Sequence, residues 1–202
     1  MILISDLQYF APMYFYLSLS TYSHCIFDQY VDLPISCYFN RCRILGANGA
    51  ILLSIPIEGG RRRKGLVRDI RVSAFEPWQA NHFKTLVSAY NRSPWFGHFR
   101  DDLEKLFRQE VTWLKDWDLS CHQWVCDKLS IVTTASLSED LIKTPGTGQQ
   151  DLRFRFVPGQ TGTAAKDRYP QVFEERHGFV PNLSILDWLF CMGPALPPEP
   201  GT

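Results

Sequence analysis

The first 28 residues, MILISDLQYFAPMYFYLSLSTYSHCIFD, carry two short apolar runs separated by an aromatic-rich segment. Residues 1–7 are typical of a buried strand, residues 13–22 of a short helix, and residues 25–28 of a second strand. A strand, a helix and a strand in this order predict a βαβ unit with parallel strands.

This unit indicates where a ligand would bind. In open α/β sheets, ligands bind beyond the carboxyl ends of the strands. Gln8 and Tyr9 follow the first predicted strand, and Asp28 ends the second. We therefore expect these three residues near a binding site.

The next part of the chain predicts an antiparallel hairpin. Residues 38–45 and 50–57 flank Gly46-Ala-Asn-Gly49, and Asn-Gly is a strong signal for a tight turn. With the βαβ start, this predicts one α/β domain over residues 1–194. Its mixed sheet would begin with the βαβ unit and contain the central hairpin, with helices packed around it.

Three helices are predicted after the hairpin. The first opens at Pro77-Trp78 and ends at Ser93-Pro94. The second carries an apolar series that extends to Val111 and Leu114. The third would begin at Ser120, where Ser-x-x-Gln resembles a capping box.

The later segments are less regular. Residues 131–137 predict a strand, and residues 144–163 are rich in Gly, Thr and Gln, which predicts a flexible connection. Residues 195–202 form a Pro-rich tail that we expect to be irregular.

Composition excludes several classes of protein. The 202 residues are 45% hydrophobic and 21% charged, and 21 basic residues balance 21 acidic ones, so no global field selects nucleic acid. No stretch approaches the roughly 18 apolar residues of a membrane helix, and the start lacks the basic region of a signal peptide. We expect a cytoplasmic protein.

The cysteines do not follow a metal-binding pattern. Two pairs have the spacing C-x4-C, whereas zinc sites usually use C-x2-C with a second pair. Reduced, buried thiols are the expected state in the cytoplasm. The sequence contains no phosphate-cradling glycine motif either, so we expect neither a metal nor a cofactor.

A basic segment suggests an anion site. On a strand, Arg41 and Arg43 face the same way, and two guanidinium groups can clamp a phosphate or carboxylate. Asn40 precedes them, and Arg71 would join them if its segment pairs nearby. The alternative is a solvated sheet face.

The segment near the carboxyl end offers a second candidate. Asn182 is a suitable N-cap for a helix over residues 183–192, in which Asp187 flanks the apolar side and Ser184 is its neighbour. His177 precedes this helix. A Ser-His-Asp triad lacks the expected nucleophile elbow. The alternatives are a structural Asp187 held by hydrogen bonds, or His177 moving a proton with Asp187 as its partner.

An unpaired carboxylate at position 187 would be costly to bury. We therefore expect Asp187 to pair with the backbone, His177, Asn40 or an arginine of residues 41–43. The remaining candidate is His82, on a predicted helix, where a structural role competes with ligand binding.

Several segments together resemble the WbqC-like protein family. The carriers are Gln8-Tyr-Phe-Ala-Pro12, residues 38–43, Asp69-Ile-Arg71, His82 and Tyr90 with Ser93-Pro94 and Phe96, and Gln171 to Asp187. The resemblance implies a bacterial protein of surface-polysaccharide (O-antigen-like) biosynthesis, and a glycine or acyl transferase acting on amino sugars. Many relatives have a longer region around residues 140–165.

These observations predict a cytoplasmic transferase acting on an amino sugar or nucleotide sugar. The alternative is a non-catalytic binding or assembly protein of a cell-envelope pathway. The expected partner is a small anionic substrate, either a nucleotide sugar or an acyl donor. The predicted catalytic residues are His177 and Asp187, and the predicted binding residues are Gln8, Asn40, Arg41, Arg43, Arg71, His82, Gln171, Asn182 and Ser184.

Overall fold

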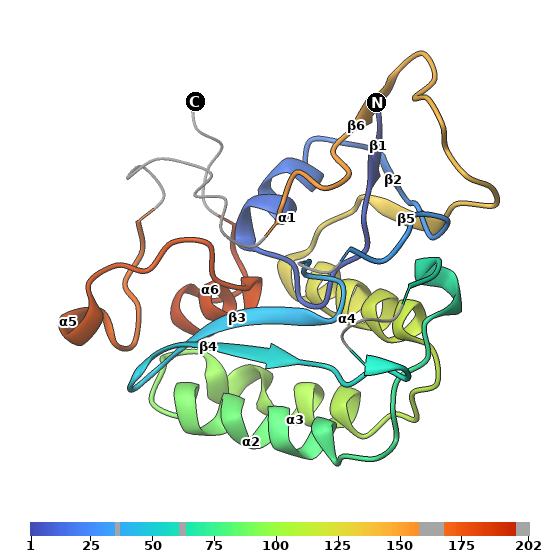
Figure 1. Cartoon of the computed structure of the whole chain (residues 1–202). Coiled ribbons are helices and arrows are strands. Elements are labelled where there is room, and N and C mark those ends of the chain that lie inside the picture. Colours follow the sequence, from blue (N-terminus) through green and yellow to red (C-terminus); the bar gives the residue numbers. More distant parts are fainter. Residues whose placement is uncertain (35–36, 61–63, 158–167, 197–202) are drawn as a thin grey trace.

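The computed structural model describes residues 1–34, 37–60, 64–157 and 168–196 and confirms the α/β class (Figure 1). The predicted βαβ unit is present. It consists of β1 (Ile2–Ser5), α1 (Met13–Leu19) and β2 (His24–Phe27). β1 and β2 are parallel along their full lengths.

Two later strands complete a four-stranded parallel sheet. They are β5 (Thr134–Leu137), which pairs with β2, and β6 (Gln149–Asp151), which pairs with β1. The order across the sheet is β5-β2-β1-β6. β6 lies within residues 144–163, where composition predicts a flexible connection; residues 158–163 are outside the described part.

The predicted hairpin forms a second sheet. β3 (Arg41–Gly46) and β4 (Gly49–Ser54) are antiparallel, and Gly49 takes a positive φ of 112° at the tight turn. The parallel and antiparallel strands form two sheets rather than the single mixed sheet that the sequence suggests. Figure 1 shows the hairpin between the parallel sheet and the helices that follow.

The helices differ from prediction at their ends. α2 (Trp78–Tyr90) is as expected, but α3 (Phe96–Phe107) stops before Val111, and the next helix, α4 (Leu114–Leu129), begins earlier than predicted. Ser120 therefore lies inside α4, where its hydroxyl donates to the carbonyl of Asp116 at 3.0 Å rather than capping the helix. The buried stripe of α4 starts at Leu114, and the apolar packing of this stripe outweighs the local capping signal.

A short 3₁₀ turn, η2 (Val67–Asp69), follows the hairpin, and two helices close the described chain, α5 (Glu174–His177) and α6 (Ile185–Met192). The N-cap of α6 is Ser184 rather than Asn182, because the Ser184 hydroxyl accepts from the Leu186 N–H at 3.3 Å. Asn182 instead has a φ of 58°, in the left-handed region that turns the chain. The Ser184 N–H donates to the Arg43 carbonyl at 2.7 Å, which fixes α6 against β3.

The core is continuous between the two sheets and the helices. All six cysteines are free thiols inside it. Within the described ranges, the helices fall short of the length and apolar character that crossing a membrane requires.

Candidate functional site

Acidic residues gather where the parallel strands end. Asp6 follows β1, Asp28 follows β2, and Asp151 ends β6. Because parallel strands finish at the same edge, side chains from distant parts of the sequence meet there. Asp28 is almost fully buried, and its carboxylate accepts from Arg153 at 2.6 Å and from Ser138 at 3.3 Å.

Arg153 holds this edge together. Its guanidinium donates to Asp151 at 2.7 Å and to the Ile142 carbonyl at 2.7 Å, in addition to Asp28. The same guanidinium lowers the pKa of Asp151. Since most of its donors are engaged, Arg153 ties β2, β6 and the preceding connection together rather than offering a free cation to a ligand.

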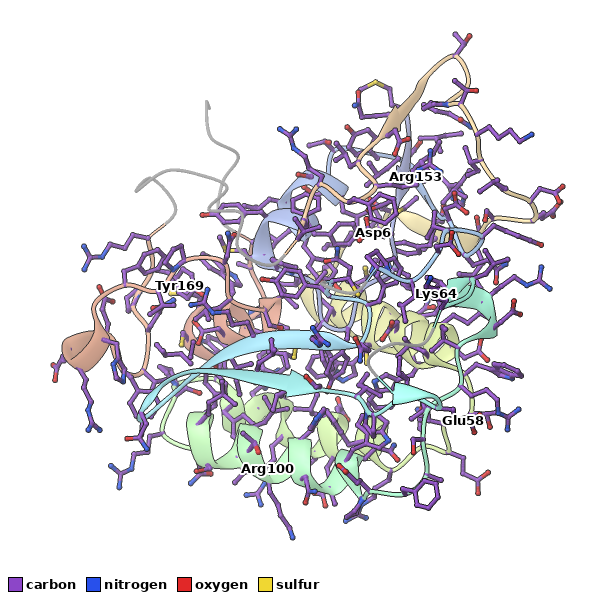
Figure 2. All side chains as sticks on the ribbon, in the orientation of Figure 1. Asp6, Glu58, Lys64, Arg100, Arg153 and Tyr169 are labelled. Carbon is purple, nitrogen blue, oxygen red and sulfur yellow. The ribbon has the colours of Figure 1, made fainter. Side chains whose placement is uncertain are left out.

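The order of the strands places a topological switch point between β1 and β6. The chain leaves β1 toward β2 and returns to the other side of β1 only with β6, and ligands of open α/β sheets bind at such a reversal. Asp6 and Gln8 lie there, both buried, and Gln8 donates to the Asp6 carboxylate and to the Phe156 carbonyl. Among the described residues, the side-chain oxygen of Gln8 has no partner. Figure 2 shows Asp6 and Arg153 near one another beside the parallel sheet.

The backbone at this switch point is constrained. The Phe154 N–H donates to the Asp6 carboxylate at 2.7 Å, and Phe154 has a φ of 58°, which is unusual for a residue other than glycine. Burial raises the pKa of Asp6, although the hydrogen bonds from Gln8 and Phe154 oppose that effect. A carboxyl group held in this way is suited to exchanging a proton with a ligand.

The segment before β3 lies against this edge. The Tyr9 N–H donates to the Tyr38 carbonyl at 3.0 Å, which joins the loop after β1 to the start of the hairpin. The thiol of Cys37 is affected by the charges of both Arg41 and Asp6, although burial is the main reason that its pKa is raised. The loop that carries Gln8 is thus joined to the segment that precedes Arg41.

Arg41 and Arg43 lie on one face of β3, opposite Ser54 and Leu52 of β4. Both side chains are half-buried, and neither forms an ion pair with a carboxylate in the part of the chain that the structure describes. Arg71 differs from them. It pairs with Glu58 at 3.4 Å, and its guanidinium stacks over the Trp113 ring at 4.8 Å.

Three other predicted binding residues form hydrogen bonds within the fold. The Asn40 amide donates to the Ile55 carbonyl at 2.9 Å. Gln171 bonds both backbone groups of Val180 and thereby closes the loop around α5. His82 is buried beside Tyr9, whose hydroxyl lies 3.0 Å from its Nδ1, and burial lowers the pKa of His82 to about 4.

Asp187 is fully buried and, as expected, is paired, but the partners are tyrosines. Tyr90 of α2 donates to one carboxylate oxygen at 2.6 Å, and Tyr169 donates to the other at 2.7 Å. Burial raises the pKa of Asp187, and the two phenols, together with the side chain of Gln171, oppose that effect. The prediction that Asp187 pairs with His177, Asn40 or an arginine of residues 41–43 was wrong. Two tyrosine hydroxyls from other parts of the chain occupy both carboxylate oxygens.

His177 contacts a different part of the molecule. Its Nε2 lies 3.0 Å from the carbonyl of Ala47, in the turn of the β3–β4 hairpin. Figure 1 shows α5 beside that end of the hairpin. Among the described residues, the structure records no bond between His177 and Asp187.

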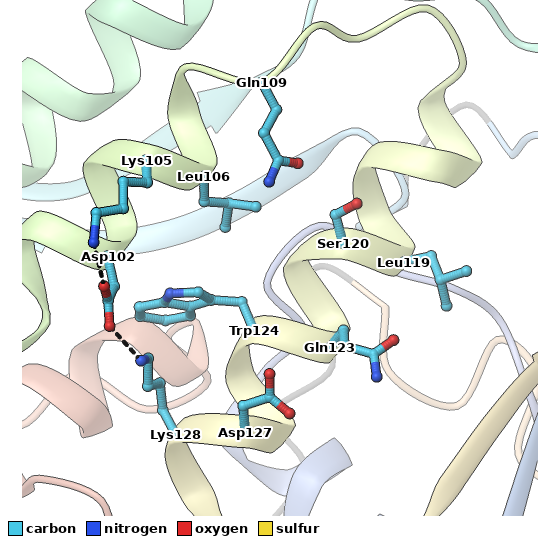
Figure 3. A pocket seen from close by; sticks show the side chains of 10 residues that line it. All are labelled: Asp102, Lys105, Leu106, Gln109, Leu119, Ser120, Gln123, Trp124, Asp127 and Lys128. Atoms are coloured by element: carbon cyan, nitrogen blue, oxygen red, sulfur yellow. Dashed lines mark hydrogen bonds and ion pairs between the residues drawn. The ribbon is translucent and has the colours of Figure 1, made fainter.

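A groove lies between α3 and α4, with a volume of about 460 Å³ (Figure 3). Lys105 and Lys128 both pair with Asp102 there, at 3.2 Å and 2.6 Å, and Trp124 is part of the lining. The two ammonium groups are therefore already engaged. Across the described ranges, no group of three or more His, Cys, Asp and Glu side chains is arranged to hold a metal ion.

Comparison with known proteins places the chain in a family context. A family model described as the WbqC-like protein family matches residues 8–157. No curated protein and no solved structure matches the chain.

Proposed function

The chain belongs to the WbqC-like protein family, and on that basis we propose that it is a cytoplasmic transferase of surface-polysaccharide (O-antigen-like) biosynthesis. Its substrate would be a nucleotide sugar or an amino sugar, and the transferred group glycine or another acyl group. The observation that carries this proposal is the pair of half-buried arginines, Arg41 and Arg43, on one face of β3, a strand whose preceding segment is hydrogen-bonded to the loop after β1.

The two parts of the site suit the two ends of such a substrate. The guanidinium groups of Arg41 and Arg43 would bind a phosphate or carboxylate. Gln8 and Asp6, which follow β1, would accept hydrogen bonds from hydroxyl or amino groups, since among the described residues the side-chain oxygen of Gln8 has no partner.

In this proposal Asp6 is the acid–base group. Its pKa is raised by burial, and it directly follows β1. We do not assign proton transfer to His177 with Asp187, because the Asp187 carboxylate is engaged by Tyr90 and Tyr169.

Replacing Arg41 by alanine should weaken the binding of a UDP-linked amino sugar by about 1.5–3 kcal/mol, the range for charge-assisted hydrogen bonds. Stability should change little, because Arg41 has no recorded ion-pair partner in the described part of the chain. Calorimetric titration measures the affinity, and the matched control is Arg71→Ala, which removes an arginine already paired with Glu58. Equal affinities for Arg41→Ala and the unaltered protein would make Arg41 part of a solvated face.

Turnover is tested directly. The protein is incubated with UDP- or dTDP-linked amino sugars and acyl donors, and mass spectrometry looks for the acylated sugar. Binding without any transfer across the panel would favour the alternative, a binding or assembly protein.

A further inference from the structure

The groove between α3 and α4 contains a buried hydrogen-bond donor without a partner. Trp124 lies on the α4 side of the groove and is 9% exposed. Its indole nitrogen is buried, and in the described part of the chain no acceptor receives its N–H. Figure 3 shows the indole reaching from α4 toward α3, with the nitrogen on the edge of the ring turned toward Leu106. A buried donor without a partner costs free energy, and an acceptor on a ligand in the groove would remove that cost.

Three exposed side chains of the same groove also have unused hydrogen-bonding groups. They are Gln109, which follows α3, and Gln123 and Asp127 of α4. Within the described ranges, the two side-chain amides and the carboxylate form no hydrogen bond or ion pair. Both dashed contacts in Figure 3 are at Asp102. Each amide offers donors and an acceptor, and the carboxylate accepts only, so the groove presents both kinds of group to a ligand.

The charges that line the groove cancel. The positive charges of Lys105 and Lys128 balance the negative charges of Asp102 and Asp127. Both lysines pair with Asp102, and Asp127 stands next to Lys128 in the sequence. An anionic ligand would meet the Asp127 carboxylate and a cationic ligand the two ammonium groups, so the groove favours an uncharged ligand.

We propose that the groove between α3 and α4 binds an uncharged saccharide. A hydroxyl group both donates and accepts, so one sugar can accept from the Trp124 N–H and donate to the Asp127 carboxylate. Two neighbouring sugar hydroxyls can donate to the two oxygens of one carboxylate, whereas a peptide presents its N–H groups singly. The volume of about 460 Å³ lies within the range of roughly 300–1,000 Å³ for small-molecule sites. The residues assigned to the transferase site do not line this groove, so the inference is separate from the proposed function.

The exposed polar groups receive the sugar first, and the buried Trp124 nitrogen is reached when a side chain of the lining moves. Lys105 is suited to this movement. Its side chain is 77% exposed, and its ion pair with Asp102 at 3.2 Å is of the exposed kind that contributes little to stability. We therefore expect the environment of the Trp124 N–H to change on binding, which gives the test a signal specific to this groove.

The experiment titrates the intact protein with glucose, galactose, mannose and N-acetylglucosamine, and NMR saturation transfer measures binding. At least one of these sugars should bind, and glucuronate and glucosamine should bind more weakly than glucose. Asp127→Ala should weaken sugar binding by at least about tenfold, the effect of one lost charge-assisted hydrogen bond. Gln123→Ala should weaken it about threefold, the effect of a neutral hydrogen bond. The indole N–H signal of Trp124, identified as the one missing from Trp124→Phe, should shift when the sugar is added.

Asp101→Ala is the matched control, because Asp101 is an exposed acid of α3 that does not line the groove. It should leave sugar binding unchanged. Arg41→Ala should also leave it unchanged, so this proposal and the transferase proposal fail independently. N-acetylalanine amide, an uncharged peptide probe, should bind more weakly than the sugar.

The absence of binding by every uncharged sugar would overturn the proposal. Unaltered affinity in both Asp127→Ala and Gln123→Ala, or equal affinity for N-acetylalanine amide, would do the same. Because Gln123 and Asp127 are exposed, we expect both variants to fold. If Trp124→Phe does not fold, these two variants decide the outcome.

Discussion

Replacing Asp118 by asparagine is expected to stabilise the protein at neutral pH. Burial raises the pKa of Asp118 well above its usual value, so the folded state retains its proton more strongly than the unfolded state. Below about pH 4, the pKa of an unfolded-state aspartate, Asp118 is protonated in both states and its contribution to stability is complete. This contribution is lost as the pH rises toward the pKa of Asp118 in the folded state. Asparagine does not titrate and avoids this loss.

The stability difference between Asp118→Asn and the unaltered protein should therefore grow with pH, by up to about 1.4 kcal/mol per pH unit above about pH 4. Urea unfolding at a series of pH values measures it. The Asp127→Asn protein provides the control for a change of charge on the exposed side of α4. A difference that stays constant with pH would show that Asp118 is ionised and paired in the folded protein.

The same substitution at Asp187 should have the opposite effect. Asp187→Asn replaces an oxygen that accepts from a tyrosine with an amide group that donates, so either Tyr90 or Tyr169 loses its acceptor. We expect a loss of about 1.5–3 kcal/mol in the free energy of unfolding, because charge-assisted hydrogen bonds are involved.

Two further variants locate the source of this loss. Tyr90→Phe should cost more than Tyr169→Phe, because the Tyr90 hydroxyl also accepts from the Leu45 N–H at 3.2 Å and so links α6 to β3. Ligand binding per folded molecule should be preserved in the Asp187→Asn protein. An unchanged unfolding midpoint combined with lost binding would instead assign Asp187 to the functional site.

Patterns within a short stretch of sequence predicted much of the fold. The βαβ unit and the hairpin follow from apolar runs and from the Asn-Gly turn, which act over a few residues. β6 was not predicted, because Gln149–Asp151 is polar and joins the sheet through backbone bonds to β1. Its pairing depends on a strand that lies near the other end of the chain.

The positions of some candidate residues in the fold were predicted for the same reason. The position of Gln8 and Asp28 after the first two strands placed them at the sheet edge, and the alternation along β3 placed Arg41 and Arg43 on one face. The role of Arg153 was not predicted, because its partner Asp28 lies 125 positions away in the sequence.

Closeness in sequence was misleading for His177 and Asp187. Gly178 and Asn182 both take positive φ values between them, and the chain turns so that α5 reaches the hairpin while α6 enters the core. Two residues that are close in sequence, His177 and Asp187, therefore contact different parts of the molecule.

The central position of β1 affects how the protein is made. During synthesis β2 soon becomes available to β1, but the other side of β1 stays open until Gln149–Asp151 has left the ribosome. At about 5–20 residues per second, the nascent chain carries this unpaired strand for many seconds. An open strand edge can pair with another chain, so this interval is when a chaperone or a neighbouring nascent chain would most readily contact the amino-terminal part of the protein.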